Sequence, residues 1–144
     1  MLSPMASTKT QENLVAVVDD DERLGRSLER FLKASGFQSV IYLSAESFLG
    51  DKQRPQFGCL IVDLQLGGIS GIDLRDSLKS AGVNVPMILM TARDEKEIDR
   101  HALQADGTIF LRKSDPGEAL LAALHRLVHR CQHQEQVLRD SGNA

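Results

Sequence analysis

The chain has 144 residues, of which 42% are hydrophobic and 26% charged, and its formal net charge is −3. This length indicates one domain with a substantial core, and the weak negative charge argues against direct nucleic-acid binding, which needs a basic face. No apolar run approaches the roughly 20 residues of a membrane-spanning helix. The two cysteines have no metal-binding spacing and suit reduced thiols, so we expect a cytoplasmic location without a membrane contact.

Short apolar stretches alternate with amphipathic stretches along the chain. Strands are predicted at residues 14–18, 40–43, 57–62, 87–90 and 108–111. Capping residues place the helix starts at Asp20 or Asp21, Ser44, Ser70, Asp94 and Asp115. A strand–helix unit repeated in this way predicts an α/β, flavodoxin-like (βα)5 fold, a doubly wound parallel sheet in the order 2-1-3-4-5.

The domain is expected to occupy residues 14–131. Residues 1–13 are interpreted as a flexible leader, and residues 132–144 as a helix extension and tail.

Polar side chains follow four of the predicted strands: Asp19 and Asp20, then Asp63, Thr91 and Lys113. The carboxyl ends of parallel strands share one edge of a sheet, so these side chains should meet there. Three close carboxylates repel one another, so either some take up protons or a cation binds, and oxygen ligands suit Mg²⁺. With Mg²⁺ and Lys113 offsetting negative charge, Asp63 could attack a phosphoryl group. Taken singly, each acid could be a helix cap and Lys113 a surface charge.

The sequence resembles the receiver domain of two-component response regulators over about residues 13–130. The resemblance rests on VVDDDE at 17–22, DLQLGGISG at 63–71, MTA at 90–92 and FLRK at 110–113. It implies a phosphorelay protein that is not a dedicated enzyme and that takes a phosphoryl group from a histidine kinase or a phosphotransfer protein.

The resemblance also implies a role for each matching residue. Asp63 would be the phosphoacceptor and, with Asp20, a direct ligand of Mg²⁺, while Asp19 would act through water. The backbone carbonyl of Gln65 would complete the protein ligands.

Three further positions match the family's switch. Lys113 would bind the phosphoryl group, Thr91 would move toward it, and Phe110 would turn inward. The helix predicted at 94–105 has few apolar residues, so the surface made by this fourth helix, the fifth strand and the fifth helix is the expected output surface and a possible homodimer interface.

The sequence departs from the family pattern at several positions. Ser114 stands where Pro usually follows the lysine, so the Lys113–Ser114 bond is expected to be trans with a shifted loop, or else cis at a cost of about 2.5–4 kcal/mol. Gly67 replaces a frequent Pro and loosens the loop, and Asp106-Gly107 replaces Gly-Ala. His125, His129 and His133 share one helix face that could bind a metal, although a solvated face is the favoured interpretation.

Three other interpretations compete with a stand-alone receiver. The pattern SAESFL at 44–49 resembles receivers of regulators with a helix-turn-helix output, so the chain could be the receiver part of a longer DNA-binding regulator. A phosphatase with an aspartyl nucleophile would carry Asp-x-Asp after the first strand, and here position 65 is Gln. A flavin-binding protein would need a phosphate loop where this chain has three acids.

Overall fold

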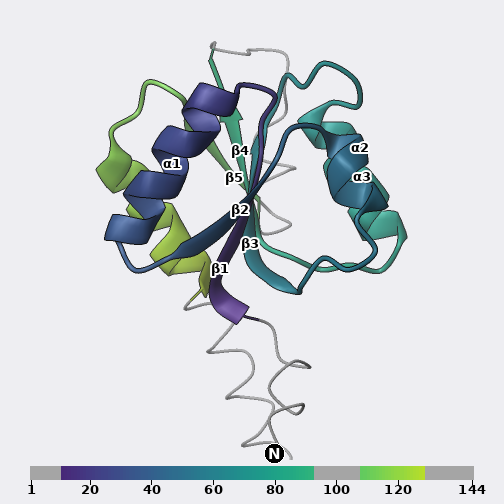
Figure 1. The fold of residues 1–144 in the computed structure, drawn as a ribbon, viewed down its shortest axis with the longest axis horizontal. Helices are drawn as coiled ribbons and strands as arrows, with labels where there is room; N and C mark the ends of the chain where they lie inside the picture. Colours follow the sequence, from purple (N-terminus) through teal and green to yellow (C-terminus); the bar gives the residue numbers. More distant parts are fainter. Residues whose placement is uncertain (1–10, 93–107, 129–144) are drawn as a thin grey trace, which may run out of the picture.

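A computed structural model describes residues 11–92 and 108–128. Its five strands are β1 (Gln11–Val18), β2 (Gln38–Tyr42), β3 (Phe57–Asp63), β4 (Met87–Thr91) and β5 (Thr108–Arg112). All neighbouring strands are parallel, and the sheet order is β2-β1-β3-β4-β5 (Figure 1). The predicted flavodoxin-like (βα)5 topology is therefore confirmed.

The described helices cover both faces of this sheet. They are α1 (Glu22–Ala34), α2 (Ala45–Gly50), α3 (Gly71–Ser80) and a helix over residues 117–128. Figure 1 shows α1 and the 117–128 helix on one side of the strands and α2 and α3 on the other. The helix predicted at 94–105 lies outside the described residues.

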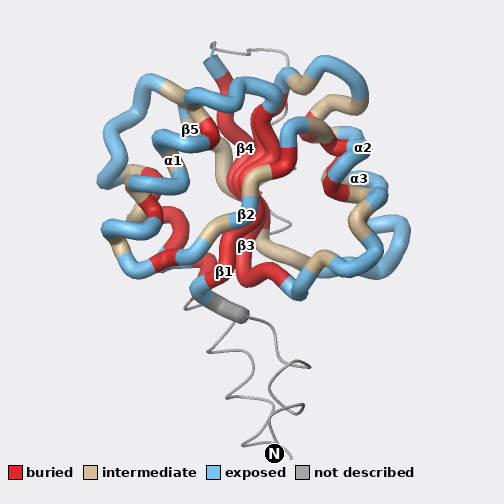
Figure 2. The backbone as a smooth tube through the Cα atoms, in the orientation of Figure 1, coloured by how far each residue is buried: buried red, intermediate tan, exposed pale blue. Residues whose placement is uncertain are grey.

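The strands at the centre of the sheet are buried on both faces, as Figure 2 shows. Along β1, Ala16 and Val18 belong to the core under α2 and α3, while Val15 and Val17 belong to the core under α1 and the 117–128 helix. Every residue of β3 is buried. A continuous apolar run in the sequence therefore corresponds to a strand that both layers of helices cover.

Most of the predicted helix caps are present. Asp21 caps α1, because its side chain accepts hydrogen bonds from two amides of the first turn. Ser44 and Ser70 cap α2 and α3, each accepting from one amide. The helices α1 and α3 are followed by Gly36 and Gly82, whose φ angles of 93° and 78° suit glycine. Local sequence chemistry thus positions the helix starts around the sheet edge.

Three elements begin at a different residue from the one that the sequence predicts. The strand β2 begins at residue 38 rather than 40, because an edge strand can begin with the exposed, polar Gln38. The strand β1 begins at residue 11, where it pairs with the start of β3. The last described helix begins at residue 117, and the carboxylate of Asp115 instead accepts a hydrogen bond from the backbone of Arg112.

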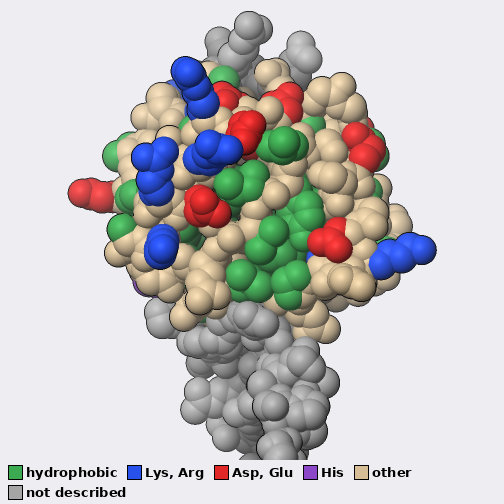
Figure 3. Space-filling view, in the orientation of Figure 1, with side chains coloured by type: hydrophobic (Ala, Val, Ile, Leu, Met, Phe, Trp, Pro, Cys, Tyr) green, Lys and Arg blue, Asp and Glu red, His purple; other side chains and the backbone are tan. Residues whose placement is uncertain are grey.

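The surface of α1 is rich in basic side chains, which Figure 3 shows gathered on one part of the molecule. Arg23, Arg26, Arg30 and Lys33 are all exposed there, and Arg26 pairs with Glu22 one turn earlier at 2.6 Å. Within the described residues, no helix combines the length and the apolar character that crossing a bilayer requires.

Candidate functional site

The carboxyl edge of the sheet brings together the polar residues that follow the strands. Val18 pairs with Val62, so Asp19 and Asp63 are neighbours at the ends of β1 and β3. The side chain of Thr91 ends β4, and its residue is 2% exposed, compared with 3% for Asp19 and 7% for Asp63. Asp20 is exposed beside them. The strand order therefore brings these residues together at one edge of the sheet, as the sequence predicts.

Asp19, Asp20 and Asp63 form a cluster of oxygen ligands. One carboxylate oxygen of each lies within 4.8 Å of the others. Two of the three acids are buried, so the charge of the cluster cannot be screened fully by water. This donor set fits a hard divalent cation such as Mg²⁺, which takes one or two carboxylates and keeps several waters.

Lys113 supplies a cation to the cluster from the end of β5. Its Nζ lies 3.0 Å from Oδ2 of Asp63 and 3.4 Å from Oδ2 of Asp19. Burial alone would lower the pKa of this amine, but the contacts with Asp63 and Asp19 outweigh burial and raise it. The ammonium group thus stays charged between the two acids.

Backbone amides orient the two buried carboxylates. Oδ1 of Asp19 accepts a hydrogen bond of 2.9 Å from the N–H of Asp21, and Oδ1 of Asp63 accepts one of 3.0 Å from the N–H of Gln65. Burial raises the pKa of Asp19, and the amide hydrogen bond and Lys113 oppose that rise. On both acids the Oδ1 atom bonds an amide and the Oδ2 atom faces Lys113.

A tight turn aims Lys113 at the acids. Its own N–H donates to the carbonyl of Thr91 at 2.7 Å. Arg112 and Asp115 are linked twice, because the Arg112 N–H donates to Oδ2 of Asp115 at 2.9 Å and the Asp115 N–H donates to the Arg112 carbonyl at 3.0 Å. The described residues contain no cis peptide bond, so the bond between Lys113 and Ser114 is trans.

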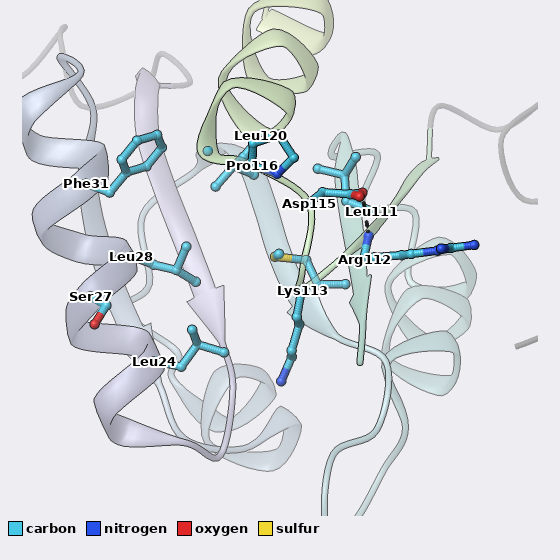
Figure 4. Close-up of a pocket in the computed structure, with 12 residues that line it drawn as sticks. Leu24, Ser27, Leu28, Phe31, Leu111, Arg112, Lys113, Asp115, Pro116 and Leu120 are labelled. Carbon is cyan, nitrogen blue, oxygen red and sulfur yellow. Dashed lines mark hydrogen bonds between the residues drawn. The ribbon is translucent and has the colours of Figure 1, made fainter. Parts of the chain in front are cut away.

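A cavity of about 210 Å³ lies between α1 and this turn. Figure 4 shows Leu24, Leu28 and Phe31 of α1 on one side and Lys113 on the other, and it marks the hydrogen bond between Arg112 and Asp115. The aliphatic stem of Lys113 therefore follows an apolar wall while its amine reaches the acids.

Other predicted residues have more limited descriptions. Phe110 is half-buried against the core under α2 and α3, and Gln65 is exposed. His125 is exposed with its ring centre 5.7 Å from that of Phe37, whereas His129 and His133 lie outside the described residues. The same holds for Asp106-Gly107, so the proposed histidine face and that substitution stay untested.

Two features of the site escaped the sequence analysis. One is the double link between Arg112 and Asp115, because Asp115 was predicted to cap a helix. The other is Glu46, whose carboxylate reaches the loop after Asp63. Its only signal in the sequence is the SAESFL pattern, which gives no hint of a contact 23 residues away.

Residues 15–125 match the family described as the response regulator receiver domain. The chain belongs to this family. It is 30% identical over 120 residues to the transcriptional regulatory protein FixJ of Azorhizobium caulinodans, an alignment that covers 83% of this chain and 57% of FixJ. The solved response regulator StyR is 28% identical with a TM-score of 0.77, over 90% of this chain and 66% of StyR.

The structure titled FixJ-N is 26% identical with a TM-score of 0.71, over 81% of this chain and 93% of that one. The receiver assignment made from the motifs is thus confirmed. The chain spans about half the length of the curated relatives it matches, and 57% of FixJ.

Proposed function

We propose that this receiver domain accepts a phosphoryl group on Asp63 from a phosphorylated histidine of a kinase or phosphotransfer protein. The observation that carries the proposal is Lys113, whose amine lies 3.0 Å from Asp63 inside a three-carboxylate cluster. A nucleophilic carboxylate needs cations around it before a phosphate can approach, and this edge of the sheet provides one.

In the transfer, a carboxylate oxygen of Asp63 attacks the phosphorus atom of the donor. A P–O bond forms, the bond between phosphorus and the imidazole nitrogen breaks, and the donor nitrogen leaves with the electron pair. Lys113 moves its ammonium from the Asp63 oxygen to a phosphoryl oxygen, and the hydroxyl of Thr91 hydrogen-bonds another. The amide of Gln65 holds Oδ1 of Asp63, so the carboxylate cannot rotate freely during attack.

Asp19, Asp20 and Asp63 would hold Mg²⁺, with the carbonyl of Gln65 as a further ligand. When bound, the ion neutralises negative charge on the phosphoryl oxygens. Of the two acids that follow β1, Asp20 is exposed and can reach an ion that keeps several waters, whereas Asp19 is 3% exposed. We therefore assign direct ligation to Asp20 and a water-mediated contact to Asp19.

Phosphorylation would switch a surface through Thr91 and Phe110. The surface proposed for the output and for a homodimer combines β5 with the fourth and fifth helices, of which the fourth lies outside the described residues. We propose a cytoplasmic signalling role, without enzymatic turnover, for a receiver that occupies residues 14–131. Because FixJ is a transcriptional regulator of which the chain covers 57%, the alternative is the receiver part of a longer DNA-binding regulator.

Intact mass spectrometry after incubation with a small phosphodonor tests the proposal. With Mg²⁺ present we expect a gain of one phosphoryl group, and we expect none with a chelator or in Asp63→Asn. Asp73→Asn is the matched control, because Asp73 is an exposed acid in the first turn of α3. A mass gain that persists in Asp63→Asn would show that another residue is the acceptor.

A further inference from the structure

The side chain of Glu46 links α2 to the loop between β3 and α3 (residues 64–70). Glu46, in the first turn of α2, accepts a hydrogen bond of 3.1 Å from the N–H of Ile69 through its Oε1. The two residues are 23 positions apart. The contact therefore joins two elements that no local turn would hold together.

The helix that carries Glu46, α2, is held at both of its ends. Ser44 and Ser47 form a capping box at the start of α2, and Phe48 buries the opposite face of the helix in the core. The side chain of Arg54 donates to the carbonyls of Phe48 and Leu49 at 3.3 and 3.2 Å, near the other end of the helix. A helix fixed at both ends can hold the Glu46 carboxylate in a defined place.

The loop passes close to the carboxylate of Glu46 and within ordinary contact of Asp20. A Cβ atom at Gly68 would lie 2.9 and 3.0 Å from the oxygens of Glu46, at or below the closest approach of real Cβ contacts. A Cβ at Gly67 would lie 3.6 Å from Oδ2 of Asp20. Two successive glycines permit this approach, but they also leave the loop conformationally free unless something anchors it.

We propose that Glu46 is a positioning residue of the metal-binding loop. By holding the N–H of Ile69, it fixes the course of the loop that carries the Gln65 carbonyl, the backbone ligand proposed for the ion. The inference rests on the proposed Mg²⁺ site and adds a residue outside the acidic cluster. Glu46 contributes to Mg²⁺ binding through the loop and touches neither the ion nor the phosphoryl group.

Titration of the full chain with Mg²⁺, followed by amide NMR signals, tests this role. Glu46→Ala removes the anchor, and we expect the dissociation constant for Mg²⁺ to rise about fivefold, the effect of one hydrogen bond. Glu46→Gln keeps an acceptor oxygen and should stay within about twofold of wild type. The amide of Ile69 should exchange with solvent faster in Glu46→Ala than in Glu46→Gln.

Two variants separate anchoring from charge and from packing. Glu29→Gln removes an exposed carboxylate from α1, and we expect unchanged Mg²⁺ binding. Gly68→Ala keeps the Glu46 carboxylate but pushes it aside, so it should weaken Mg²⁺ binding in the wild-type background and have a smaller effect in Glu46→Ala.

The results also distinguish this inference from the function on which it rests. If wild type binds Mg²⁺ and Glu46→Ala binds it equally well, the positioning role is wrong and the acidic cluster stands. If Glu46→Gln is as weak as Glu46→Ala, the carboxylate acts through its charge and the hydrogen bond is not the cause. If wild type fails to bind Mg²⁺ at all, the proposed metal site itself fails.

Discussion

At the proposed Mg²⁺ site, Lys113 would compete with the ion for the same carboxylates, so removing its charge should strengthen metal binding. The variant Lys113→Met suits this test, because the stem of Lys113 lines the apolar cavity beside α1 and methionine preserves much of that packing. In the variant, Asp19 and Asp63 lose their 3.4 and 3.0 Å contacts with the amine. Phosphorylation should become slower at the same time, since the amine no longer meets the phosphoryl group.

The magnitude follows from the burial of the three groups. The side chain of Lys113 is 23% exposed, whereas those of Asp63 and Asp19 are 7% and 5% exposed. Exposed ion pairs contribute about 0.2–1 kcal/mol and hydrogen bonds to charged groups about 1.5–3 kcal/mol. A value near 1.4 kcal/mol lies between these classes, and it corresponds to a roughly tenfold lower dissociation constant for Mg²⁺.

Thermal unfolding measures this difference. At a Mg²⁺ concentration ten times the wild-type dissociation constant, binding stabilises wild type by about 1.4 kcal/mol and the variant by about 2.7 kcal/mol. For a chain of this size the extra stabilisation is a further rise in Tm of roughly 3–5 °C. In chelator, the variant should be less stable than wild type, because two buried carboxylates then have no cation.

The matched control is Lys33→Met, which removes the same charge from the last turn of α1. It should leave the dissociation constant for Mg²⁺ and the gain in Tm unchanged. Equal or weaker Mg²⁺ binding in Lys113→Met would refute the competition, and it would mean that the amine and the metal occupy separate parts of the pocket.

Three further predictions follow from neighbouring contacts. Asp20→Asn should weaken Mg²⁺ binding about tenfold and by more than Asp19→Asn does, whereas equal dissociation constants would contradict direct ligation by Asp20. Tyr42 is the chain's single tyrosine, and burial and a 2.7 Å hydrogen bond to a carboxylate raise its pKa from 10.0 to about 12. In a pH titration its tyrosinate absorbance should therefore appear only near pH 12. Between pH 10.0 and about 12 the free energy of unfolding should fall by about 1.4 kcal/mol per pH unit, because the unfolded state loses the proton first, and Tyr42→Phe should remove this slope. Gly117→Ala should lower the free energy of unfolding by about 1–2 kcal/mol, because its Cβ would lie 2.7 Å from the Phe31 ring; in a Phe31→Leu background urea unfolding should show a smaller loss.

The order of the elements and the core could be predicted because both depend on local pattern. A strand buried on both faces, such as β3, is a continuous apolar run, and caps such as Ser44 use only neighbouring residues. The start of β2 was placed too late because Gln38 and Ser39 are polar. Their position is set by pairing with Leu14 and Val15 of β1. Backbone pairing with a neighbouring strand requires no particular side chains in the edge strand, so its sequence does not indicate where the pairing begins.

Part of the site could be predicted from the sequence in the same way. Acids and a lysine at strand ends predict a shared edge once the sheet order is known, and Lys113 does lie against Asp63 and Asp19. The contact from Glu46 to the loop could not be predicted in this way. It joins an exposed side chain to a backbone amide, and an amide carries no sequence signal of its own.

At Ser114, where the family usually has proline, hydrogen bonds restrain the turn that a proline ring would otherwise restrain. A proline would restrict the turn covalently, whereas Ser114 leaves its φ angle free and adds an N–H donor. The turn is restrained instead by the two hydrogen bonds between Arg112 and Asp115 and by the N–H of Lys113, which donates to the Thr91 carbonyl. Since hydrogen bonds can open where a proline ring cannot, the position of Lys113 in this chain depends on the contacts of Asp115. The proposed move of the lysine from Asp63 to a phosphoryl group would act on a turn that can open.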